Sequence, residues 1–237
     1  MVTKILSKAV LAVISISLFS ATAFAEGKHS QLFHAFILEG QTGINDSSDS
    51  TSSWELDGWY GGDYNKLWLK SEGEIHKSTV EDAEVQALYS RNIHNFWDAQ
   101  VGIRHDIEPD ATTYAVIGVN GLAPYFFETE AHLFLSEDGD VTARIKQSNE
   151  FLVTQRLILE PYAEINLSAQ DVPSKDIGTG LADGEVGLQT RYEYTRKFAP
   201  YVDINYGTKF GKTANLAEKN GEDTDSFNAS IGLRIMF

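Results

Sequence analysis

Residues 226–237 read SFNASIGLRIMF, and this stretch decides the fold class. Every second residue, counted back from the end, is apolar, and the residues between are mostly polar or small. A period of two is typical of a β-strand with one apolar face. A soluble sheet packed on a core has the same pattern, so the rest of the chain must decide between the two. The apolar residues are Phe227, Ala229, Ile231, Leu233, Ile235 and Phe237.

The same alternation recurs along the chain. Gly, Asn, Asp and Ser lie between the alternating segments as turn residues, and no comparable segment has the 3.6-residue period of a helix. We therefore predict twelve strands, and ten if residues 31–39 or 52–60 pair elsewhere. The segments are 31–39, 52–60, 65–76, 83–93, 96–106, 112–122, 125–137, 140–153, 156–169, 184–196, 199–210 and 226–237.

The connections between these segments differ in length. Odd-numbered connections include the long, acidic stretches 40–51, 170–183 and 211–225, whereas even-numbered ones are tight, such as 61–64 and Ala123-Pro124. Short periplasmic turns and longer extracellular loops are typical of outer-membrane barrels. We therefore predict an all-β protein, an antiparallel transmembrane β-barrel with both termini at the periplasmic end.

The N-terminal segment and the composition agree with that location. Residues 1–25 have the form of a secretory signal peptide, with Lys4 and Lys8 before a 12-residue apolar core and Ala23-Phe24-Ala25 as the cleavage site. Residues 26–237 would then form the barrel, in the cell outer membrane. Removal of both lysines takes the net charge from −15 to −17. This charge argues against nucleic acid or anionic lipid as a partner and favours cations. The chain has no cysteine, so no thiolate metal site is possible.

Alternation assigns the two faces of the wall. The apolar stripes, such as Val101 with Ile103 and Val186 with Leu188, should face outer-membrane lipid. Aromatic residues near strand ends fit the interfacial girdles, and a terminal aromatic such as Phe237 resembles the signal that outer-membrane insertion machinery reads. The lumen face would be charged.

Two lumen rows have the pattern E-x-E-x-H. Carboxylate and imidazole ligands suit borderline divalent ions such as Cu(II) and Zn(II). The pattern also fits lumen charges that merely pair across neighbouring strands, and the two strands need not be adjacent. No G-x-S-x-G, H-E-x-x-H or Gly-rich phosphate loop occurs, so we expect no enzyme. The candidate metal ligands are Glu128, Glu130 and His132 in one row and Glu72, Glu74 and His76 in the other.

With these segments in view, the chain resembles the copper resistance protein B family from about residue 31 onward. The resemblance implies a barrel in the outer membrane, a role in copper homeostasis or resistance, and copper ion binding. It also brings periplasmic copper-resistance proteins into view as partners. The stretches that carry it are GWYGGDYNKLWLKSEGE (58–74), EVQALYSRNIHNFWDAQVGIRHD (84–106), GVNGLAPYFFETEAHLFLSEDG (118–139), RLILEPYAEINL (156–167), residues 180–211 and the closing GLRIMF.

The methionine content departs from that family. Members often carry a Met- and His-rich segment before the barrel, whereas Met1 and Met236 are the only methionines here. We expect a short form without soft ligands for Cu(I), in which weak or transient contact with Cu(II) is favoured. The alternative, from another class, is a structural or non-selective barrel whose lumen charges are paired.

Overall fold

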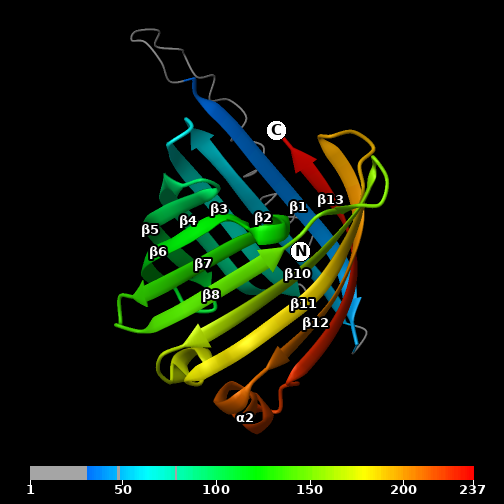
Figure 1. Ribbon diagram of the computed structural model, residues 1–237. Coiled ribbons are helices and arrows are strands. Elements are labelled where there is room, and N and C mark those ends of the chain that lie inside the picture. The colour runs from blue at the N-terminus through cyan, green and yellow to red at the C-terminus, as the bar shows by residue number, and fades with distance from the viewer. Residues whose placement is uncertain (1–30, 47–48, 78) are drawn as a thin grey trace, which may run out of the picture. The chain divides into compact units, whose positions relative to one another are not determined.

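A long antiparallel sheet closes on itself in the computed structural model, which describes residues 31–46, 49–77 and 79–237 (Figure 1). The strands pair in chain order, and β1 closes the barrel by pairing with both β2 and β13. The predicted signal peptide, residues 1–25, lies outside the described residues. The strands are β1 (Phe33–Asn45), β2 (Ser50–Gly61), β3 (Asn65–His76), β4 (Thr79–His94), β5 (Trp97–Glu108), β6 (Thr112–Ala123), β7 (Phe127–Ser136), β8 (Val141–Ser148), β9 (Phe151–Leu152), β10 (Leu157–Ser168), β11 (Gly180–Tyr192), β12 (Phe198–Lys209) and β13 (Asp225–Met236).

The short strand β9 continues β8 rather than adding to the wall. Both strands pair with β10, β8 opposite Tyr162–Ser168 and β9 opposite Ile158 and Leu159. Pro161 of β10 faces the gap between them and has no N–H to donate, which interrupts the ladder there. Within the described residues the wall therefore has twelve strands, as predicted, and residues 31–39 and 52–60 both belong to it.

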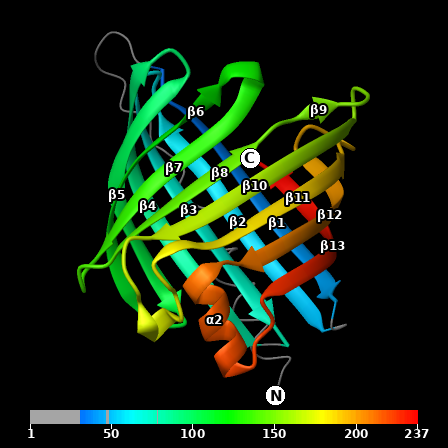
Figure 2. The ribbon, with the colours of Figure 1, turned by 60° about the horizontal axis from the view of Figure 1, so that its bottom comes forward.

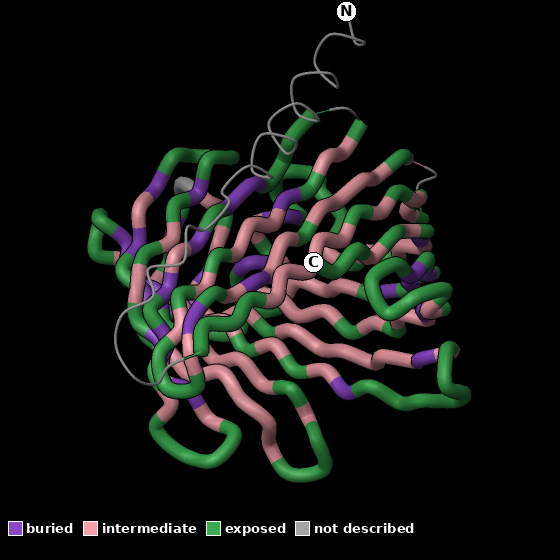
Figure 3. The backbone as a smooth tube through the Cα atoms, turned by 90° about the horizontal axis from the view of Figure 1, so that it is seen from above, coloured by how far each residue is buried: buried purple, intermediate pink, exposed green. Residues whose placement is uncertain are grey.

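The two faces of the wall alternate as predicted. On β13, Ile231 is 65% exposed and Leu233 is 46% exposed, while Ser230 between such positions is buried. The same alternation is visible along most strands in Figure 3, where exposed segments recur between less exposed ones. On β1, Ile37 and Glu39 line the lumen cavity. β1 is apolar on both faces, so the sequence alone did not show which face lines the lumen. The structure places Ile37 and Glu39 on the lumen face, and the outer face carries His34, Phe36 and Leu38.

The prediction of long loops is correct for two connections and wrong for the third. Residues 169–179, which contain a 3-10 turn η3 (Pro173–Lys175), and residues 210–224 lie at one end, called here the long-connection end. Residues 40–51 are mostly strand instead, because β1 runs to Asn45 and β2 begins at Ser50. Thr42 and Ser52 face each other there, and their hydroxyls are hydrogen-bonded at 3.0 Å, so this polar stretch still forms a ladder.

A helix that the sequence analysis did not predict lies in the last connection. α2 (Gly211–Asn220) ends at Gly221, whose positive φ of 76° suits glycine, and it is visible below the barrel in Figures 1 and 2. It buries only Thr213 and Ala217, four residues apart, which is too sparse a stripe to give a periodic signal. None of the helices in the described chain is long and apolar enough to span a membrane.

Candidate functional site: the barrel lumen

The lumen holds an apolar plug on one side of the barrel. Leu88, Tyr114, Val116 and Phe134, from β4, β6 and β7, are buried together, and Trp68 packs against them. The guanidinium of Arg104 lies 4.9 Å from the centre of the Phe134 ring. These side chains fill the lumen on this side of the barrel, so polar groups there lie in small, desolvated spaces.

A cavity of about 730 Å³ remains in the lumen. Among the described residues, eleven carboxylates line it against three basic side chains, Lys66, Lys146 and Arg234. The open part of the lumen is therefore strongly negative. A passing cation would be attracted and an anion repelled, with little screening where walls of low dielectric surround the charges.

Carboxylates also occupy one level of five consecutive strands. Each is the direct cross-strand partner of the next, although like charges placed directly opposite each other are destabilising. The row is Glu39, Glu55, Glu72, Glu84 and Asp106, on β1 to β5. A row of this kind needs cations from elsewhere.

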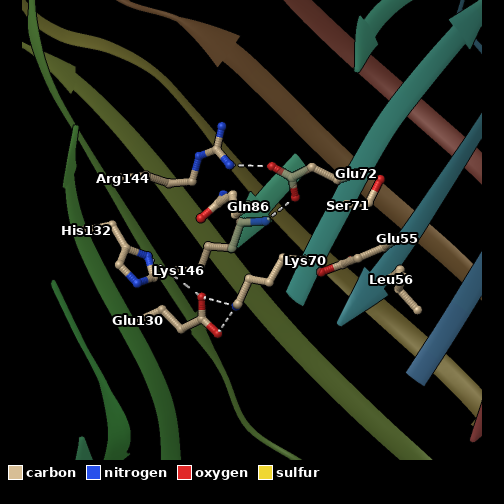
Figure 4. A pocket seen from close by; sticks show the side chains of 10 residues that line it. All are labelled: Glu55, Leu56, Lys70, Ser71, Glu72, Gln86, Glu130, His132, Arg144 and Lys146. Atoms are coloured by element: carbon tan, nitrogen blue, oxygen red, sulfur yellow. Dashed lines mark hydrogen bonds and ion pairs between the residues drawn. The ribbon is translucent and has the colours of Figure 1, made fainter. Parts of the chain in front are cut away.

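The compensating cations for Glu72 come from the far side of the lumen. Arg144 of β8 is hydrogen-bonded to Glu72 of β3 and lies 3.1 Å from Glu84. Lys146 of β8 reaches Glu72 at 2.8 Å (Figure 4). It also lies 3.3 Å from Glu164, its cross-strand partner on β10. Lumen charges therefore pair across the barrel as well as between neighbouring strands.

Two of the three residues in the predicted β7 row already have polar partners within the protein. Glu130 accepts hydrogen bonds from Lys70 at 2.6 Å and from Asn120 at 2.9 Å. His132 is 5% exposed, its Nε2 lies 2.7 Å from Gln100 Oε1, and its Nδ1 lies 4.0 Å from Glu130. Glu128 lines the large cavity and forms no ion pair with any described residue.

The predicted β3 row spreads towards the long-connection end. Glu72 is held as described above, Glu74 lines the large cavity, and His76 lies 3.7 Å from Asp49 in the first connection. The register shift beside Glu74 leaves Glu81 of β4 without a direct partner, whereas β3 itself stays regular, so His76 is simply the last residue of the row at the end of the strand.

The fold brings together only three of the six residues in the two rows. Glu72, Glu130 and His132 line a cavity of about 40 Å³, which also receives Lys70, Arg144 and Lys146 (Figure 4). Within the described chain, no three His, Asp or Glu side chains are arranged to hold a metal ion. The sequence analysis expected lumen charges to pair across neighbouring strands, but it did not foresee that Arg144 and Lys146 reach Glu72 from the far side of the barrel.

One connection crosses the barrel mouth. Lys175 of η3 donates to Asp106 of β5 at 2.7 Å and to Tyr114 of β6 at 2.5 Å, on the opposite part of the wall. Burial alone would lower the pKa of Lys175, but these two bonds outweigh it and raise that pKa, so the ammonium stays charged. The connection forms a strap over the long-connection end.

The helix α2 braces the strap. Gly178 N–H donates to Thr213 Oγ1 at 3.0 Å, and a Cβ at Gly178 would lie 2.3 Å from Lys212 Cβ, so glycine permits this close approach. Lys212 also pairs with Asp171 at 3.0 Å. The hydrogen bond from the Thr179 N–H and this ammonium lower the pKa of Asp171.

A closed antiparallel wall with an apolar outer face and a charged lumen defines a β-barrel of the outer-membrane class. Solved structures agree on the fold. The NanC porin is 14% identical with a TM-score of 0.58 over 84% of this chain and 98% of that one, and the KdgM porin is 11% identical with a TM-score of 0.55 over 85% and 99%.

Sequence comparison defines the family. The family model described as Copper resistance protein B precursor (CopB) matches residues 34–237, and the chain belongs to this family. Copper resistance protein B of Escherichia coli is 41% identical over 193 residues, which are 80% of this chain and 65% of that protein. The Copper resistance protein B homolog of Pseudomonas syringae pv. tomato (strain ATCC BAA-871 / DC3000) is 36% identical over 211 residues, 88% and 72% of the two chains. The predicted family is confirmed, and membership agrees with the expectation of a non-enzymatic protein.

Proposed function

We propose that this protein is an outer-membrane barrel of copper homeostasis or resistance that binds or passes copper ions through its lumen. The observation that carries the proposal is the excess of carboxylates, eleven against three basic side chains, around the described lumen cavity. Membership of the copper resistance protein B family supports copper as the cation. Residues 1–25 would serve as the export signal, and lipid and the insertion machinery would be its partners in the membrane, with periplasmic copper-resistance proteins on the inner side.

The proposed contacts are Glu128, Glu130, His132, Glu72, Glu74 and His76. Glu128 and Glu74 face the large cavity. Glu130 and Glu72 are already bound by Lys70, Lys146 and Arg144, so copper must compete with these groups for the carboxylate oxygens. This competition favours weak, transient contact with Cu(II), and a carrier or passage role over tight storage.

The competing candidate is a structural or non-selective barrel whose lumen charges are only paired. The ion pairs of Arg144 and Lys146 across the lumen favour it, because they satisfy several carboxylates without any metal. Copper binding and copper tolerance separate the two candidates.

The test is a Cu(II) titration of the purified barrel, with wild type and the triple variant Glu128→Ala, Glu130→Ala, His132→Ala. We expect the triple variant to bind several-fold more weakly. A matched control removes two exposed carboxylates of the connections, Glu137→Ala and Glu218→Ala, and should bind like wild type.

Equal binding by wild type and triple variant would refute the proposed contacts. A deletion strain complemented with each variant then tests the role in cells. If the purified barrel binds no copper and the deletion strain tolerates copper normally, the copper function itself is refuted.

A further inference from the structure

A second part of the lumen, on β10, β11 and β12, contains buried oxygen atoms without a donor. Glu160, Gln189 and Asp203 are direct cross-strand partners in turn, so their side chains share one level and one face. All three line the large cavity, on the side away from the apolar plug.

Asp203 is a buried carboxylate without a cation. The residue is 3% exposed, and none of the basic side chains in the described chain forms an ion pair with it. Its Oδ2 accepts hydrogen bonds from the Tyr162 hydroxyl at 3.1 Å and from Asn205 Nδ2 at 3.0 Å. Its Oδ1 is inaccessible to solvent and has no hydrogen-bond partner among the described residues. Buried charges in proteins are normally paired or bound to a metal, so a ligand is missing here.

Gln189 presents a second oxygen in the same condition. Its amide nitrogen donates to Glu39 Oε2 at 2.9 Å, which fixes the orientation of the amide because a carboxylate needs a donor. The carbonyl Oε1 therefore points away from Glu39, and it is buried without a partner in the described chain. Directly opposite positions on neighbouring strands place side chains about 5 Å apart at Cβ, within reach of one shared ion.

The surrounding groups hold the Asp203 carboxylate in place but bring no positive charge to it. Tyr162 can lie across to Asp203 because the strand between them has glycine at 187, where a Cβ would come within 2.3 Å of the Tyr162 ring. Arg234 lies 3.3 Å from Glu39 and 3.5 Å from Glu160, and Arg191 also binds Glu160. These guanidinium groups satisfy the neighbouring acids and contact neither unpartnered oxygen.

We infer that Asp203 Oδ1 and Gln189 Oε1 form a binding site for a small hard cation, with water completing the coordination. Oxygen is the only donor element that these residues offer, which suits a hard ion such as Ca²⁺ or Mn²⁺, whereas each proposed copper row also offers an imidazole nitrogen. The site is separate from the two predicted E-x-E-x-H rows and does not depend on the proposed copper function.

Mn²⁺ is the probe, because its electron paramagnetic resonance signal distinguishes free from bound ion. Purified wild-type barrel should bind Mn²⁺, and Ca²⁺ should displace it. Asp203→Asn should weaken Mn²⁺ binding at least tenfold, and Gln189→Leu should weaken it several-fold. The control is Asp98→Asn, which removes another buried acid of the same cavity, one already bound to Lys66 at 2.7 Å, and should leave Mn²⁺ binding unchanged.

Heat-dependent gel mobility shows that each variant is folded before binding is compared. Absence of Mn²⁺ binding by wild type would overturn the site and indicate that a proton shared by the two oxygens satisfies them instead. Equal binding by Asp203→Asn and wild type, or an equal loss in Asp98→Asn, would also overturn it. Cu(II) titration of the same preparations is read separately, so the copper function can stand when this site falls.

Discussion

Lys70 shows how single residues hold the lumen together. Its ammonium lies 2.6 Å from Glu130 of β7 and 2.8 Å from Asp57 of β2, and its side chain is 14% exposed. It therefore ties β3 to a strand four positions away in the wall, and it neutralises two acids at once. In a lumen with few cations, such a residue controls both stability and the charge that a visiting ion meets.

Replacing Lys70 by alanine should destabilise the barrel by about 1–3 kcal/mol, because two partly desolvated carboxylates lose their cation. The urea midpoint of the barrel in detergent measures the change. The control is Lys77→Ala, in which an exposed lysine loses its 2.6 Å pair with Asp49, and the midpoint is expected to stay close to that of wild type because exposed ion pairs contribute little. Equal midpoints for wild type and Lys70→Ala would show that the contact with Glu130 does not support the fold.

At the scale of elements, β13 closes the wall and shows the two faces most clearly. It pairs with β12 on one side and β1 on the other, and the Phe237 ring stacks on Phe36 at 6.1 Å beside this closing seam. Its apolar residues point outward over the whole strand. The face assignment can therefore be tested at several depths in one element.

Lysine substitutions along β13 should reduce assembly according to depth. Ile231 lies halfway along the strand and is 65% exposed, so Ile231→Lys should destabilise the folded barrel by about 2–4 kcal/mol. Ile235→Lys, near the interface, should destabilise it by about 0–1 kcal/mol, and Leu233→Lys should have an intermediate effect. Folding efficiency into lipid vesicles measures this series. Normal insertion of both Ile231→Lys and Leu233→Lys would mean that the faces are reversed.

The strap over the mouth is the second element with a testable role. In the described chain, the strap is hydrogen-bonded to Asp106 and Tyr114 only through Lys175. Lys175→Ala should therefore release the strap and raise single-channel conductance in planar bilayers. Lys219→Ala removes an exposed lysine from the last turn of the adjacent helix, and it serves as the control with little change expected. Unchanged conductance in Lys175→Ala would show that the strap does not limit the pore.

At the scale of the whole molecule, charge is distributed unevenly between wall and lumen. The outer face is apolar, and the lumen cavity described here is lined by eleven acids and three bases. We expect the pore to prefer cations, which a reversal potential in a KCl gradient would show. The preference should weaken near 1 M salt, where the screening length falls to about 3 Å. A preference for anions would contradict both the acidic lumen and the proposed copper passage.

The sequence alone determined the strand count, the two faces, the acidic lumen and the family. Alternation with a period of two is a local property of each strand, so SFNASIGLRIMF and its eleven counterparts could be read without knowing their partners. The alternation did not predict the split of β8 from β9, because that split depends on Pro161 of the neighbouring strand. It did not predict the helix α2 either, because this helix buries only two small residues.

Only the tertiary structure decided which lumen residues meet. Register and barrel closure bring Glu72 to Arg144 and Glu130 to Lys70 across the lumen, while His76, at the end of its strand, lies beside Asp49 instead. They also place Asp203 and Gln189, each with a buried unpartnered oxygen, directly opposite each other on neighbouring strands. Contacts between residues far apart in the sequence, such as Gln189 with Glu39 at a separation of 150 positions, depend on how the whole sheet closes, and no local pattern encodes them.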